Sequence, residues 1–168
     1  RAELQEDDWR RMMQLLTSLQ SSVTRVHRNI PMTGNFISYR GSTVNWCPIG
    51  RNADDADREE WCLWDSRQEI RQNWLKIARQ GLDNADLEHV VIKLGGDTSF
   101  DIYPEGWDKT FAFKQFEDYD EIFFIGDRCG PYGNDKEAYE LAGELGYITA
   151  GPDQTVDIIR KIITQIST

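Results

Sequence analysis

The stretch FFIGDRCGPYGND, residues 123–135, decides the fold of the last third of this chain. It opens with an almost entirely apolar run, which is typical of a strand that is buried on both faces of a sheet. The run ends at Gly126 and Asp127, and Asn134 and Asp135 follow closely. The pattern has two interpretations: a strand, a turn and a helix cap, or a metal and phosphate site at the carboxyl end of a strand, where open α/β sheets bind ligands.

The residues after this stretch predict a helix over 135–145, a short strand in GYITA and a last helix over 153–165. Together with the apolar strand they form a β-α-β-α order, which is typical of half a doubly wound parallel unit. A parallel sheet of two strands is too small to be buried on both faces. We therefore expect that part of the sheet is missing from this chain or that something else pairs with it.

The first part of the chain has helices of a different kind. Residues 3–28 carry apolar side chains at helical spacing, and Pro31 ends that pattern. The acidic segment ADDADREEW suits the start of a second helix. Residues 66–80 continue as a helix that we expect Gly81 to stop.

Two pairs of strands accompany these helices. NFISYRGSTVNWCPIG predicts a hairpin around Arg40-Gly41-Ser42, and LEHVVIKLGGDTSFDIYP predicts two strands that turn at Gly95-Gly96 and close at Pro104. The chain is therefore expected to divide near residue 105 into an α+β part and an α/β part.

Composition narrows the classes of partner. The chain has 168 residues, a net charge of −10 and a pI of about 4.7, which disfavours nucleic acid as a partner. A few arginines in a pocket can still attract a phosphorylated small molecule. The sequence contains no apolar run long enough to span a membrane and no visible secretion signal. Its three cysteines form no CxxC pair, which favours a reducing, cytoplasmic location over a zinc site or a disulfide framework.

Three motifs resemble those of a known family. CPIGR at 47–51, GGDTSFDIYPEGWDK at 95–109 and GDRCGPYGND at 126–135 closely resemble segments of eukaryote-type phosphomannomutases, which belong to the haloacid-dehalogenase superfamily. The motifs occur in the family's order and with nearly its spacing, and the similarity runs over almost the whole chain.

The resemblance implies an α/β fold of the haloacid-dehalogenase type. Residues 1–105 would form an α+β cap domain with an antiparallel sheet, which binds substrate and dimerises. Residues 106–168 would form the C-terminal half of a Rossmann-like parallel core. It also implies a homodimer made through the cap, and the N-terminal helix supports this with apolar residues on more than one face.

The resemblance also assigns roles to polar residues of the core part. Asp127 would bind Mg²⁺, which takes oxygen ligands, and the alternative is an aspartate that caps a helix or stabilises a turn. Lys109 would neutralise the transferring phosphoryl group, and otherwise it is a solvated surface lysine. Asn134 and Asp135 would orient the metal ligands and Lys109, although both residue types also cap helices.

In the cap part the resemblance points to a phosphate clamp of Arg40, Arg51 and Arg58. Arginine binds phosphate through paired, charged hydrogen bonds, but neighbouring carboxylates allow plain surface ion pairs instead. Ser99 and Asp101 alternate on a strand and so share one face. They match the family's contacts to sugar hydroxyls, and without the resemblance they would be a polar pair on an edge strand.

The family's nucleophile is the feature that this sequence lacks. No DxD motif follows an apolar strand here, and Cys129 stands where an acid would follow Asp127 by two residues. The full-length enzyme would convert mannose 6-phosphate to mannose 1-phosphate through an aspartyl phosphate, within mannose metabolism and GDP-mannose biosynthesis, with Mg²⁺ and a hexose bisphosphate activator. We expect this chain alone to be inactive. The alternatives are a hexose-phosphate phosphatase of the same superfamily and a non-catalytic remnant that binds sugar phosphates or dimerises.

Overall fold

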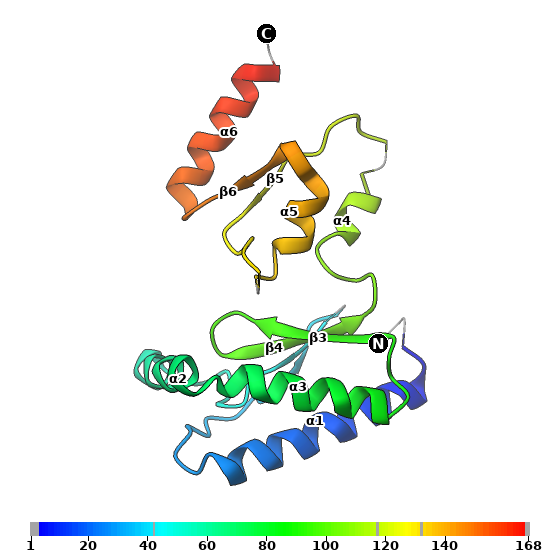
Figure 1. Ribbon diagram of the computed structural model, residues 1–168, viewed down its shortest axis with the longest axis vertical. Helices are drawn as coiled ribbons and strands as arrows, with labels where there is room; N and C mark the ends of the chain where they lie inside the picture. Colours follow the sequence, from blue (N-terminus) through cyan, green and yellow to red (C-terminus); the bar gives the residue numbers. More distant parts are fainter. Residues whose placement is uncertain (1–3, 42, 117, 132, 167–168) are drawn as a thin grey trace. The chain divides into compact units, whose positions relative to one another are not determined.

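The computed structural model describes residues 4–41, 43–116, 118–131 and 133–166, and it contains two compact units (Figure 1). The first unit is Arg1–Trp107 and the second is Asp108–Thr168. Each unit is built from its own sheet and helices.

A four-stranded antiparallel sheet organises the first unit, with the strand order β1-β2-β4-β3. Its strands are β1 (Ile37–Tyr39), β2 (Val44–Trp46), β3 (Val90–Gly95) and β4 (Ser99–Pro104). Both predicted strand pairs are confirmed, although Ser42 of the first turn lies outside the described residues. The central pairing joins β2 to β4 and places Asn45 opposite Asp101 and Trp46 opposite Phe100.

The helices of the first unit are α1 (Glu6–Val26), α2 (Asp55–Gln68) and α3 (Ile70–Asn84). The prediction that Gly81 stops a helix is wrong, because α3 runs through it to Asn84. A Cβ atom at Gly81 would come within 2.6 Å of the Leu15 side chain, so glycine here lets α1 and α3 approach closely. The break between α2 and α3 falls instead at Glu69, whose φ of 51° is left-handed.

The two faces of the sheet differ in character. One face packs against α1 and α3 and forms the core, in which the rings of Trp46 and Phe100 stack with centroids 4.6 Å apart. Alternate residues of the same strands point to the opposite face. That face carries the polar side chains of Asn45, Ser99 and Asp101. The alternation therefore places a hydrophobic core on one face of the sheet and a cluster of polar side chains on the other.

The second unit has the predicted β-α-β-α order, with β5 and β6 paired in parallel. Its elements are α4 (Phe111–Lys114), β5 (Phe124–Gly126), α5 (Lys136–Ala142), the 3-10 helix η1 (Gly143–Leu145), β6 (Gly146–Ile148) and α6 (Pro152–Ile166). The short helix α4 was not predicted. The mixed α/β organisation implied by the resemblance, with an antiparallel sheet first and a parallel pair last, is confirmed.

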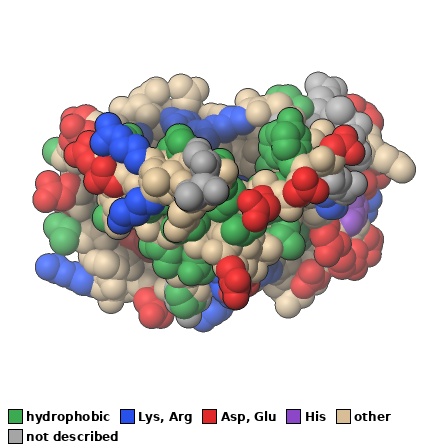
Figure 2. Space-filling model, turned by 90° about the horizontal axis from the view of Figure 1, so that it is seen from above, with side chains coloured by type: hydrophobic (Ala, Val, Ile, Leu, Met, Phe, Trp, Pro, Cys, Tyr) green, Lys and Arg blue, Asp and Glu red, His purple; other side chains and the backbone are tan. Residues whose placement is uncertain are grey.

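Apolar side chains of the second unit remain partly in solvent. Phe124 and Ile125 on β5 are only half-buried, because a sheet of two strands has no further strands to cover them. On α6 a stripe of aliphatic side chains is exposed: Val156, Ile159, Ile163 and Ile166. Hydrophobic side chains are visible between charged ones on the face drawn in Figure 2. The second unit thus exposes apolar surface of the kind that a complete domain usually buries.

The end of α1 carries a histidine whose protonation opposes folding. Trp74 Nε1 donates a hydrogen bond of 3.1 Å to Nε2 of His27, so this nitrogen carries no proton in the fold. Burial lowers the pKa of His27 below its usual value of 6.5. A group with a lowered basic pKa stabilises the fold fully above the unfolded value and loses that contribution as the pH falls below it.

We therefore predict that the free energy of unfolding falls by about 0.5–1 kcal/mol as the pH drops from about 7.5 to about 5.5. Urea unfolding at stepped pH values measures it. His27→Gln should flatten this part of the profile. His89→Gln, which replaces the chain's other histidine, should leave the contribution of His27 in place. If the free energy of unfolding of His27→Gln fell with pH as steeply as that of the parent, the role assigned to His27 would be contradicted.

Candidate functional site

A tight loop between β2 and α2 presents Arg51 to solvent. Gly50 has a φ of 88°, and a Cβ atom there would lie 2.3 Å from the carbonyl oxygen of Gly34, so the loop requires glycine. The backbone N–H of Arg51 donates to the same carbonyl oxygen at 3.0 Å. The backbone before the arginine is therefore held rigidly while its side chain remains exposed.

The guanidinium of Arg51 is tied to the polar face of the sheet through Asn45. Arg51 Nη1 donates to Asn45 Oδ1 at 2.9 Å. Asn45 Nδ2 in turn donates to Asp101 Oδ1 at 2.7 Å and to Ser99 Oγ at 2.9 Å. Three of the residues predicted for the cap, Arg51, Ser99 and Asp101, are thus joined through one carboxamide.

Arg58 extends this group from the first turns of α2. Its guanidinium donates to the carbonyl oxygens of Ala53 and Arg51, both at 3.0 Å, and to Thr98 Oγ1 at 3.3 Å. Arginine has five N–H donors, so two remain for an anion. We call Asn45, Arg51, Arg58, Ser99 and Asp101 the polar sheet cluster. It holds two arginines and one aspartate and so carries one net positive charge, within a chain of net charge −10.

The other cap predictions have less direct support in the geometry. Arg40 is exposed at the β1–β2 turn, where its backbone N–H donates to Thr43 O at 2.8 Å. Among the described residues no hydrogen bond joins it to the polar sheet cluster. Ser99 is buried, and its hydroxyl already donates to the carbonyl oxygen of Gly95 at 2.7 Å. Its contact with a sugar therefore stays a prediction and would have to use the oxygen as an acceptor.

In the second unit the polar residues after β5 gather around Asp135. This carboxylate is 3% exposed, pairs with Lys109 Nζ and accepts a hydrogen bond of 3.1 Å from the backbone N–H of Arg128. Burial alone would raise the pKa of Asp135, but the hydrogen bonds from Lys109 and Arg128 outweigh it and lower the pKa. The side chains of Asp127 and Asp135 also interact. We call Lys109, Asp127, Asn134 and Asp135 the strand-end cluster.

The side-chain oxygen atoms of the strand-end cluster are suited to binding a hard cation. Asp127 is exposed, and Asn134 Oδ1 is a buried oxygen for which the described residues supply no hydrogen-bond partner. Carboxylate and amide oxygens are the ligands that Mg²⁺ and Ca²⁺ take in proteins. No group of three or more His, Cys, Asp or Glu side chains gathers as a metal site in the described part of the chain. The oxygen atoms of Asp127 and Asn134 could supply part of the coordination shell of such an ion. Other groups would have to supply the remaining ligands.

Cys129 lies in the same loop and is an unsuitable nucleophile. The thiol is buried, and burial, together with the nearby carboxylates of Asp135 and Asp127, raises its pKa. A protonated thiol is a weak nucleophile and a weak metal ligand. The chemistry of this loop therefore belongs to its oxygen donors and Lys109.

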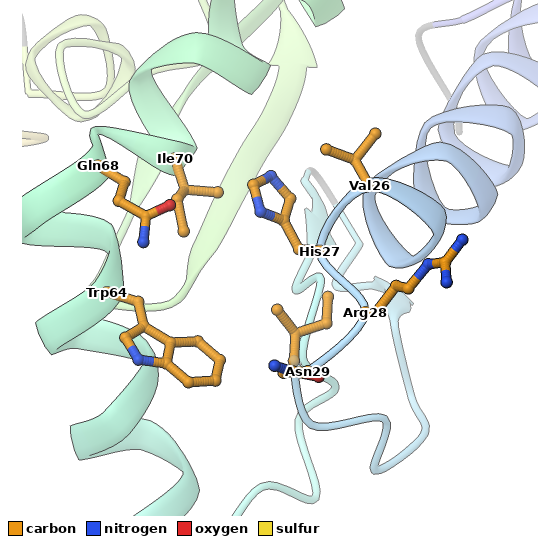
Figure 3. A pocket seen from close by; sticks show the side chains of 8 residues that line it. Val26, His27, Arg28, Asn29, Trp64, Gln68 and Ile70 are labelled. Carbon is orange, nitrogen blue, oxygen red and sulfur yellow. The ribbon is translucent and has the colours of Figure 1, made fainter.

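A separate pocket of about 420 Å³ lies in the first unit, between the end of α1 and the junction of α2 and α3 (Figure 3). Trp64, Gln68 and Ile70 form one wall and face His27 and Asn29 on the other. None of the residues predicted for the site lines it. The pocket is thus distinct from the polar sheet cluster.

Sequence reasoning singled out neither Asn45 nor Thr98, although they accept hydrogen bonds from the side chains of Arg51 and Arg58. Both are polar side chains that are nearly buried, with exposed fractions of 2% and 6%. For Asn45 a signal existed, because it stands between the apolar residues Val44 and Trp46 on a strand and so points away from the core. Its partners lie more than 50 residues away and could not be inferred from local pattern.

Sequence comparison shows which family this chain belongs to. A family-wide sequence profile described as eukaryotic phosphomannomutase matches residues 3–165. A phosphomannomutase of Arabidopsis thaliana is 38% identical over 123 residues, covering 73% of this chain and 49% of the relative. One of Glycine max is 36% identical over 132 residues, covering 79% and 52%. The chain spans about half the length of the curated relatives it matches.

A solved structure shares the fold. An IMP-nucleotidase of Plasmodium falciparum, N-terminally truncated and bound to IMP, matches 95% of this chain and 38% of its own with a TM-score of 0.57. At 12% identity the likeness concerns the fold alone. It agrees with the haloacid-dehalogenase type of fold that the motifs predicted. In the part of the chain that the structure describes, no helix has the length and apolar character to cross a membrane.

The pairing of Lys109 with Asp135 predicts a measurable contribution to the stability of the second unit. Lys109→Met leaves a buried carboxylate without its cation, and the half-exposed position of the lysine moderates the cost. We expect the free energy of unfolding to fall by about 1–2 kcal/mol at neutral pH. Urea unfolding followed by NMR signals of the second unit measures it.

The pH dependence of this loss has a definite sign. A lowered acidic pKa stabilises the fold above the unfolded value, 3.8 for Asp135, and the contribution vanishes as the pH falls through the folded value. Parent and Lys109→Met should therefore converge in strong acid. Lys114→Met on α4, which removes an exposed lysine, should change little. Equal losses from the two substitutions would contradict the pairing.

Proposed function

Because the chain belongs to the eukaryotic phosphomannomutase family, we propose that its first unit binds the phosphate and hydroxyl groups of a hexose phosphate. The single observation that supports this most is the setting of Arg51. The residue is exposed, its guanidinium donates one structural hydrogen bond to Asn45, and its backbone carbonyl accepts a hydrogen bond from a second arginine, Arg58. A tethered but accessible arginine suits paired, charged hydrogen bonds to phosphate.

The hydroxyl contacts are assigned to Asp101, with Ser99 as an acceptor. One oxygen of the Asp101 carboxylate accepts a hydrogen bond of 2.7 Å from Asn45, and we propose that the carboxylate also accepts one from a sugar hydroxyl. Arg40 adds a further cation at the β1–β2 turn. Together these groups would recognise a small polar anion with neighbouring hydroxyl groups, which describes a sugar phosphate.

For the whole protein we propose phosphomannomutase activity, an isomerisation that moves a phosphoryl group between the two ends of mannose. Mg²⁺ bound through Asp127 would neutralise charge on the phosphoryl group as it transfers. Asn134 would orient the ligands from the loop, and Asp135 would hold Lys109 in place as a fixed positive charge. Homodimerisation and activation by a hexose bisphosphate belong to the same proposal.

The first test is binding. Arg51→Gln should weaken binding of mannose 6-phosphate about tenfold or more, because a charged hydrogen bond contributes about 1.5–3 kcal/mol. Arg58→Ala should also weaken binding of mannose 6-phosphate. It removes a hydrogen-bond donor and the hydrogen bond from Arg58 to the Arg51 backbone carbonyl. Calorimetric titration measures both.

The matched control is Arg67→Gln, which removes an exposed arginine near the end of α2. It changes the net charge equally and should leave binding within about twofold, because solvent and salt screen a remote exposed charge. Equal weakening by Arg51→Gln and Arg67→Gln would mean that overall charge, and not this site, governs binding.

The second test is turnover. Residues 1–168 contain no DxD motif after an apolar strand, so no side chain is assigned to form the covalent phosphoryl intermediate. We expect this polypeptide with Mg²⁺ to bind mannose 6-phosphate without converting or hydrolysing it. Turnover that Asp127→Asn abolishes would show that the nucleophile is misassigned. Release of phosphate without mannose 1-phosphate, measured on the whole protein, would favour a phosphatase.

A further inference from the structure

We propose that Asn45 is the positioning residue of the sugar-phosphate site: it aligns Arg51 and Asp101 through one buried carboxamide and does not touch the ligand itself. The inference rests on the proposed function, because it concerns the same site. It assigns a role to a residue that none of the sequence motifs had singled out.

The burial of Asn45 excludes direct contact with a ligand. The residue is 2% exposed, and its side-chain nitrogen and oxygen both make hydrogen bonds to protein groups. Its oxygen accepts from Arg51 Nη1, and its nitrogen lies within 2.7 Å of Asp101 Oδ1, 2.9 Å of Ser99 Oγ and 3.3 Å of Phe100 O. Any effect of Asn45 on binding must therefore pass through these neighbours.

The chemistry of the position calls for a carboxamide. One side must accept from a cation, Arg51, and the other must donate to an anion, Asp101. A carboxamide does both at once, whereas a carboxylate can only accept and an ammonium can only donate. Without it, nothing in the described cluster would hold the guanidinium and the carboxylate apart, and the two could pair directly and withdraw both charges from a ligand.

The opposite side of Asp101 is also shaped for a fixed carboxylate. A Cβ atom at Gly95 would lie 2.5 Å from Asp101 Oδ2, so this carboxylate occupies space that only glycine leaves open. Lys93 is the cross-strand partner of Asp101 on β3. Asp101 is therefore held from β2 by Asn45, while β3 contributes Gly95 beneath it and Lys93 beside it.

Replacement by aspartate separates positioning from simple structural support. Asn45→Asp has almost the same shape, but at neutral pH it sets a second carboxylate at hydrogen-bond distance from Asp101. Two carboxylates this close cannot both ionise easily, so the pair retains one shared proton up to a higher pH than a lone carboxyl group would. When protonated, the new side chain again donates to Asp101 and accepts from Arg51, as asparagine does. Binding lost at high pH should therefore return as the pH falls.

The experiment titrates sulfate, whose charge does not change between about pH 5 and about pH 8, into the chain and its variants. We expect Asn45→Asp to bind sulfate at least about tenfold more weakly than the parent at about pH 8 and to recover most of that loss at about pH 5. Asn73→Asp adds the same charge at an exposed position on α3 and should show neither effect. A loss that does not depend on pH would overturn the positioning role.

A double-mutant cycle tests whether Asn45 acts through Arg51. In the parent, Asn45→Ala should weaken sulfate binding about tenfold. In an Arg51→Ala background the same change should cost less than about twofold, because the group that Asn45 positions is gone. Equal effects in the two backgrounds would overturn the proposal, while weaker binding by Arg51→Ala alone would leave the proposed function standing.

A measurement on the parent protein avoids the risk that a variant does not fold. In the NMR spectrum of the parent, the carboxamide protons of Asn45 should shift when sulfate is added, along with the guanidinium of Arg51. The carboxamide of Asn73 serves as the reference. A shift of Arg51 without one of Asn45 would refute the coupling and keep the proposed function, whereas no binding of either sulfate or mannose 6-phosphate would overturn both.

Discussion

The antiparallel pairing of β2 with β4 is the constraint on which the first unit depends. It joins segments more than 50 residues apart and sets Trp46 opposite Phe100 on one face and Asn45 opposite Asp101 on the other. The first pair stacks in the core, and the second begins the polar sheet cluster. Because side chains alternate along a strand, a slip of one residue would exchange core and site together. The hydrophobic core and the polar sheet cluster thus depend on the same strand register.

Hydrogen bonds fix the two positively charged side chains of the polar sheet cluster, Arg51 and Arg58. The chain as a whole is strongly acidic, yet the Arg58 guanidinium donates hydrogen bonds to the backbone carbonyl of Arg51 and to the buried Thr98. Arg58 is largely engaged with the protein, so Arg51 remains the more accessible of the two. We expect these arginines to favour a small anion over nucleic acid, because the net charge of −10 on the chain repels a polyanion.

The second unit shows how a loop can be organised around one buried carboxylate. Asp135 holds Lys109 and the Arg128 backbone, and Asn134 leaves an amide oxygen with no partner among the described residues. The hydrogen bonds on Asp135 keep it ionised despite its burial. Its two-stranded sheet, however, leaves apolar side chains of β5 and α6 partly in solvent. The carboxylate of Asp135 is therefore more completely buried than the aliphatic side chains of α6.

The sequence by itself determined the order and kind of the main elements, because hydrophobic periodicity and turn residues act locally. It also pointed to Asp127, Lys109 and the cap arginines, through motifs that resemble a family. It misjudged Gly81, since close approach of α1 to α3 is a tertiary requirement. Only the tertiary structure revealed Asn45 as the link between Arg51 and Asp101, because hydrogen bonds between distant segments depend on strand register, which no local pattern encodes.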